Sequence, residues 1–77
     1  ELSSLDKKYT EKTLYAIDRA IQLAPTDPKF YYNKALILDS EGKKEESIKV
    51  LQKAIELKPN YLEAKAQLEE ATASARP

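Results

Sequence analysis

The sequence of 77 residues contains no cysteine, histidine, methionine or tryptophan. Without cysteine or histidine it offers no zinc-finger ligands, thiol nucleophile, disulfide framework or imidazole base. The 13 basic and 13 acidic residues cancel, whereas nucleic-acid binders normally carry a basic excess. No apolar run approaches the ~20 residues of a membrane span. These absences favour a non-catalytic chain with no cofactor, no metal, no nucleic-acid partner and no direct membrane insertion.

Glycine is nearly absent as well, since Gly42 is the only one. Hairpin turns with positive φ angles usually need glycine, so its scarcity argues against an all-β fold. The chain is instead rich in alanine, leucine, glutamate and lysine, which favour helices. Its length allows one domain at most. The lack of cysteine is typical of a reducing compartment, so a cytoplasmic location is the default expectation.

Apolar spacing and helix-breaking residues divide the chain into four predicted helices. Asp27 is a suitable N-cap for the second helix, with Pro28 in the first helical position. Gly42 ends that helix, Pro59 ends the third, and Asn60 is the predicted N-cap of the fourth. The predicted helices cover residues 5–23, 28–40, 44–57 and 61–74.

An internal repeat relates the first predicted helix to the third. A shift of 34 residues superposes residues of the same chemical type on the apolar stripe and at the helix end. A repeated unit must bury the same face against its neighbour, which explains why the agreement falls there. The matched pairs are Glu11 with Glu45, Leu14 with Ile48, Ile17 with Leu51, Ala20 with Ala54, Ile21 with Ile55 and Pro25 with Pro59.

The segment from Tyr31 to Pro59 carries a recurrent pattern of aromatic and small residues. It opens with Tyr-Tyr-Asn-Lys-Ala at 31–35, reaches a glycine turn and continues with Ser47, Leu51 and Ala54. This pattern resembles the tetratricopeptide repeat, a helix–turn–helix unit of about 34 residues. Tyrosine stands for the family's tryptophan, Ala35 for its glycine and Lys34 for its leucine. The resemblance implies an all-α fold, an α-solenoid fragment of roughly 1.5–2 antiparallel helix–turn–helix units.

The resemblance also implies a division of one domain, residues 1–77, into parts. Residues 5–24 correspond to the second helix of a partial first repeat, and residues 28–58 correspond to a full repeat. Residues 60–75 are predicted to be a C-terminal capping helix, apolar toward the preceding unit and polar toward solvent. The apolar positions are Ala64, Leu68 and Ala71, and the polar ones are Lys65, Glu69 and Thr72.

In tetratricopeptide arrays the first helix of each unit lines a concave groove that binds peptides. The resemblance therefore implies a protein-interaction module with an unidentified protein or peptide partner. Asn33 can form two hydrogen bonds to a peptide backbone, and Tyr32 offers a flat amphipathic contact. The same positions can also be a plain solvated face. Carried over by position, the groove residues are Lys29, Tyr32, Asn33, Leu36, Asp39, Glu63, Gln67 and Glu70.

Some family members clamp the acidic C-terminal tails of chaperones with Lys and Asn on successive groove helices. Lys29 and Asn33 match the first half of that clamp. Gln67 then replaces an asparagine, and Glu63 would repel a carboxylate. The third helix of the clamp has no counterpart, so this specificity is not expected here.

An alternative function is structural. The first predicted helix should have a partner on its free side, and this chain holds no obvious one. The helix would then self-associate, giving a homodimer, or dock on the rest of a larger parent protein. The candidate self-association residues are Leu5, Tyr9, Ala16 and Ile17. The simpler interpretation is that these few apolar residues are exposed to solvent without a function, as single apolar residues on protein surfaces commonly are.

Overall fold

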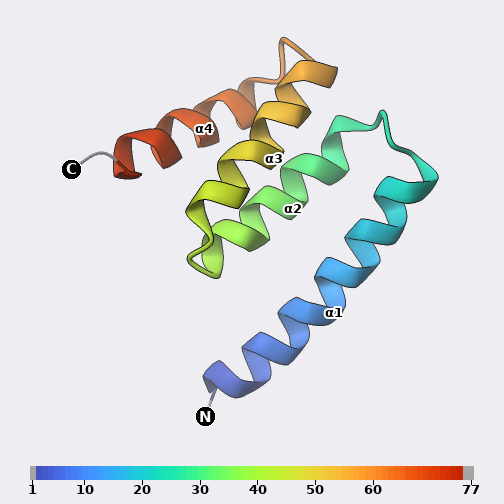
Figure 1. Ribbon diagram of the computed structural model, residues 1–77, viewed down its shortest axis with the longest axis vertical. Coiled ribbons are helices and arrows are strands. Elements are labelled where there is room, and N and C mark those ends of the chain that lie inside the picture. Colours follow the sequence, from blue (N-terminus) through green and yellow to red (C-terminus); the bar gives the residue numbers. More distant parts are fainter. Residues whose placement is uncertain (1, 76–77) are drawn as a thin grey trace.

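The structure, a computed structural model, describes the backbone of residues 2–75 and the side chains of residues 10–73. Its four helices are α1 (Leu2–Leu23), α2 (Pro28–Ser40), α3 (Lys44–Leu57) and α4 (Leu62–Ala75), and residues 2–75 contain no strand. Helices adjacent in sequence lie side by side (Figure 1). The predicted all-α fold of four antiparallel helices is thus confirmed. None of the described helices combines the length and apolar character that crossing a membrane demands.

Local signals explain the ends of α2. The Asp27 carboxylate accepts a hydrogen bond of 3.1 Å from the Lys29 N–H, and Pro28 fills the first helical position. At the other end Gly42 has a φ of +81°. There the Lys43 N–H donates to the Leu38 carbonyl (2.9 Å), and the Gly42 N–H donates to the carbonyl of residue 39 (3.0 Å). These two bonds make a Schellman cap, so α2 stops where its sequence predicts.

Two predicted helix starts are wrong. The helix α1 begins at Leu2 rather than Leu5, because no proline or glycine interrupts residues 2–5.

The helix α4 begins at Leu62 rather than Tyr61. The Tyr61 N–H closes a turn on the Lys58 carbonyl (3.0 Å), and the Tyr61 carbonyl accepts the first helical bond, from the Lys65 N–H (3.0 Å). Tyr61 therefore holds the N-cap position, and Asn60 is a turn residue.

The backbone repeats the period of 34 residues seen in the sequence. The Ala24 N–H donates to the Ala20 carbonyl (2.8 Å), as the Lys58 N–H does to the Ala54 carbonyl (3.0 Å). The Asp27 N–H donates to the Ala24 carbonyl (3.1 Å), which matches the Tyr61 turn. Both turns have proline as their second residue, a position that suits its fixed φ. The connections α1–α2 and α3–α4 are therefore built in the same way.

Small residues form the centre of the core, between α2, α3 and α4. Ala35, Ser47, Leu51, Ala54 and Ala64 are all 0 % exposed. The Ser47 hydroxyl donates a buried hydrogen bond of 2.9 Å to the Ala35 carbonyl, which ties α3 to α2. Side chains this small let the helix axes approach closely, and the bond satisfies the only buried hydroxyl among them. This region is the most completely buried part of the described chain.

The helix α1 packs less completely against its neighbours than the helices α2, α3 and α4 do. An ion pair of 2.8 Å joins Lys34 on α2 to Asp18 on α1, with both side chains partly exposed. Lys34 occupies the position where the tetratricopeptide pattern that this sequence resembles has leucine, and its long stem can cover apolar surface while its charge reaches solvent. The N-terminal turns of α1 run beyond the end of α2 (Figure 1). As a result α1 lies at one edge of the molecule with one side open.

Candidate binding groove

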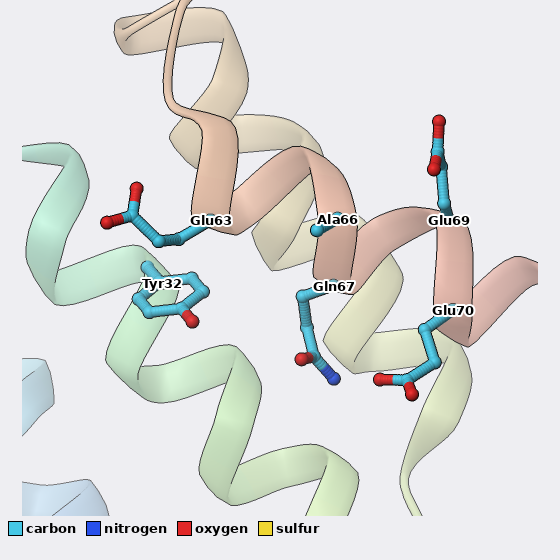
Figure 2. A pocket seen from close by; sticks show the side chains of 6 residues that line it. All are labelled: Tyr32, Glu63, Ala66, Gln67, Glu69 and Glu70. Carbon is cyan, nitrogen blue, oxygen red and sulfur yellow. The ribbon is translucent and has the colours of Figure 1, made fainter.

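The helices α2 and α4 flank a hollow on one face of the molecule. Figure 2 shows Tyr32 on α2 opposite Glu63, Gln67 and Glu70, whose side chains extend from α4 toward the side where α2 lies. The hollow is open to solvent and has a volume of about 620 Å³. It is lined by Tyr32, Glu63, Ala66, Gln67, Glu69 and Glu70.

An aromatic pair positions Tyr32 at this hollow. Its ring centroid lies 5.3 Å from that of Tyr61, at an interplanar angle of 48°. Such tilted pairs stabilise beyond the area they bury, so Tyr61 restricts the orientation of the Tyr32 ring. On Tyr61, the other member of the aromatic pair, the Lys58 Nζ lies 4.8 Å from the ring centroid. A cation thus already contacts the π-face of this aromatic pair.

The environment of Tyr61 disfavours its phenolate form. Burial raises the pKa of the Tyr61 phenol above its ordinary value, and the negative charge of Glu63 acts in the same direction. Tyr32 and Asp27 contribute further to this higher pKa. The phenol of Tyr61 is therefore neutral throughout the physiological range.

The structure brings together four of the eight predicted groove residues: Tyr32, Glu63, Gln67 and Glu70. The other four lie on α2 outside the lining. Asn33 is exposed, and Leu36 is 36 % exposed. Lys29 is exposed at the start of α2, with its Nζ 6.0 Å from the Phe30 ring centroid. Lys29, Asn33 and Leu36 stay predicted contacts for a longer ligand.

Asp39 has a partner within the chain. Its Oδ1 lies 3.0 Å from the Lys44 Nζ, across the turn from α2 to α3. This oxygen is shielded from solvent and makes no directed hydrogen bond, so the lysine charge is what compensates it. The carboxylate of Asp39 therefore supports the α2–α3 turn instead of the hollow.

Sequence reasoning did not place Glu69 at the hollow, because its position was assigned to the polar side of the capping helix, which was expected to face solvent. Figure 2 shows the Glu69 side chain pointing away from Tyr32, whereas Glu63 and Glu70 point toward the α2 side. Glu69 thus forms an outer edge of the lining. The sequence could have indicated this position, because Glu69 is next to the predicted groove residue Glu70 and neighbouring residues on a helix border adjacent faces.

The other predicted surface lies on α1. Leu5 and Tyr9 fall outside the described side chains. Ala16 is exposed, and Ile17 is half-buried. Their neighbour Tyr15 is 67 % exposed. The described part of α1 thus presents apolar groups to solvent.

Comparison with known proteins agrees with these features. The sequence model of the family described as "Tetratricopeptide repeat" matches residues 28–61, which cover α2, α3 and the turn after them. The chain carries a tetratricopeptide repeat domain. It is 34% identical over 59 residues to a TPR repeat-containing protein of Methanocaldococcus jannaschii. The match covers 77% of this chain and 18% of that relative, so the chain spans less than a fifth of its length.

Tetratricopeptide domains in general mediate protein–protein interactions and are non-catalytic. A general role of the domain class does not identify the surface that a particular member uses. In this tetratricopeptide domain, two of the described surfaces are candidates for contact with a partner protein. They are the hollow between α2 and α4 and the open side of α1.

Proposed function

We propose that this tetratricopeptide domain binds a peptide segment of a partner protein in the hollow between α2 and α4. The observation that carries the proposal is the convergence of Tyr32 with Glu63, Gln67 and Glu70 from two helices that are not adjacent in sequence. These side chains offer an aromatic surface, an amide and carboxylates to a ligand. A peptide, with its alternating donors and acceptors, matches that set.

The partner is unidentified, so the test begins from random peptides. The immobilised domain is used to select binders from a phage-displayed library, and the selected peptide is titrated into the domain. We expect amide chemical shifts to change around Tyr32, Asn33 and Gln67. Tyr32→Ala and Gln67→Ala, which each remove a side chain that lines the hollow, should abolish binding with the circular dichroism spectrum unchanged. Full-strength binding by both variants would overturn the proposal.

The alternative, an assembly role for α1, has an observation of its own in its favour. Leu51 and Ala54 on α3 are 0 % exposed against the helices beside them. Their repeat counterparts on α1, Ile17 and Ala20, are only half-buried. A second copy of the chain, or another part of a larger parent protein, would cover this side of α1. Its test is a measurement of mass in solution, given in the Discussion.

A further inference from the structure

We infer that the peptide bound in this hollow is cationic and extended, with two basic side chains three residues apart that pair with Glu63 and Glu70. This inference rests on the proposed function and adds the charge and spacing of the ligand. Three features carry it: carboxylates with no ion-pair partner among the described side chains, an aromatic surface suited to a cation, and the distance between the two acidic residues.

The carboxylates on α4 are not neutralised within the described part of the chain. The ion pairs there join Lys34 to Asp18, Lys43 to Glu41, Lys44 to Asp39 and Lys53 to Glu56. Glu63 and Glu70 are absent from these pairs, and no lysine or arginine lines the hollow. A concave surface lined by charges of one sign attracts ligands of the other sign. The hollow therefore favours a basic ligand and repels an acidic one.

The aromatic pair supplies the second feature. Lys58 already places its ammonium 4.8 Å from the centroid of Tyr61, so a cation is accepted on this pair within the molecule itself. Tyr32, the other member, lines the hollow beside Glu63 (Figure 2). A guanidinium at this point can contact the Tyr32 ring and pair with a carboxylate. Arginine suits both contacts better than lysine because its planar group stacks and forms paired hydrogen bonds.

Spacing supplies the third feature. Glu63 and Glu70 are seven residues apart on α4, which is two turns or about 10.5 Å along the axis. Both side chains extend toward the α2 side of that helix (Figure 2). In a polyproline-type extended peptide, residues three apart share one face and are about 9.3 Å apart. Arginines in an Arg-x-x-Arg arrangement therefore reach both carboxylates at once.

The experiment uses the full chain and three synthetic peptides of equal length, each capped at both ends. The first carries two arginines three residues apart in a proline-rich background. The second has glutamines in place of the arginines, and the third has adjacent arginines. Affinities are measured by isothermal titration in low salt and at 0.5 M NaCl, where exposed charge pairs are largely screened.

We expect the spaced-arginine peptide to bind at least about 5-fold more tightly than the glutamine peptide and than the adjacent-arginine peptide. High salt should remove most of that difference. Glu63→Gln and Glu70→Gln should each weaken binding of the spaced peptide by about 2- to 5-fold. Glu11→Gln is the matched control, because it removes the same charge from an exposed position on α1 and should leave the affinity unchanged.

The outcomes separate the inference from the function on which it rests. If the glutamine peptide binds as tightly as the spaced-arginine peptide, the charge inference is overturned and the binding function stands. If Glu11→Gln weakens binding as much as Glu63→Gln, the attraction is diffuse, and the assignment to this hollow is overturned. If the adjacent-arginine peptide binds equally well, the spacing is overturned. If none of the three peptides binds and the random library yields no binding peptide, the proposed function itself is overturned.

Discussion

Ala54 shows how the size of one side chain sets the distance between helices. It is 0 % exposed in the cluster that also contains Ala35, Leu51 and Ala64, from three different helices. A methyl group fills the available space, so each additional carbon must displace a neighbouring helix. The Ser47 hydrogen bond to the Ala35 carbonyl depends on the same close approach.

We therefore predict that Ala54→Leu lowers the free energy of unfolding by roughly 1–3 kcal/mol through overpacking. Urea denaturation followed by circular dichroism measures the change. Ala73→Leu provides the control, because Ala73 is exposed on α4 and the same substitution there should shift stability by less than about 0.5 kcal/mol. An Ala54→Leu protein as stable as the original would be incompatible with the helix packing described above.

At the scale of the helices, the connection between α2 and α3 depends on backbone conformation. Gly42 adopts a φ of +81°, and a Cβ added there would meet no atom within 4 Å. The two hydrogen bonds of the Schellman cap require this left-handed residue. Asp39 and Lys44 pair across the same turn, at 3.0 Å. The turn thus orients α3 against α2 through both backbone and charge.

Gly42→Ala should therefore cost stability by conformational strain alone, about 1–2 kcal/mol, since no neighbour obstructs the methyl group. Thermal unfolding measures this loss. Gly42→Asn should retain more of the stability, because asparagine adopts the left-handed conformation more readily than alanine does. Equal melting temperatures for all three proteins would show that the cap contributes nothing measurable.

Across the whole molecule, the four helices form a thin layer with Cα extents of 39 × 38 × 16 Å. In such a layer each helix is covered mainly by its neighbours along the chain, as solenoid units are. The helix α4 packs its apolar side backward, with Ala64 at 0 % and Ala71 at 2 % exposure, while Lys65 and Glu69 are exposed. Its capping role stays a prediction. At the opposite edge, α1 leaves Tyr15 and Ala16 exposed.

The assembly alternative predicts a concentration-dependent dimer, measured as mass by light scattering after size exclusion. Ile17→Glu should then give a monomer, because a charge placed in a desolvated contact is costly. Gln22→Glu adds the same charge at an exposed position of α1 and should leave the mass unchanged. Circular dichroism verifies that both variants remain helical. A monomer at every concentration in the unmodified chain would exclude the homodimer.

Much of the fold follows from signals that act within a few residues. Asp27 with Pro28 and Gly42 with its φ above zero determine where α2 begins and ends, because caps and turns depend on local backbone geometry. The period of 34 residues, visible as Ala20 with Ala54, reappears in the hydrogen bonds of the turns. The start of α4 was missed because Asn60 suits both a cap and a turn, and the bond from Tyr61 to Lys58 selects the turn.

The candidate site is different, because its members come from helices that only the tertiary structure brings together. Helical spacing alone could place Glu63, Gln67 and Glu70 on one side of α4. Their position opposite Tyr32, and the contact of Tyr32 with Tyr61, depend on how α2 and α4 pack around α3. Whether Asp39 faced the hollow was likewise decided by a charge on the next helix. Local chemistry determined the helices, and distances between residues far apart in sequence determined which side chains meet.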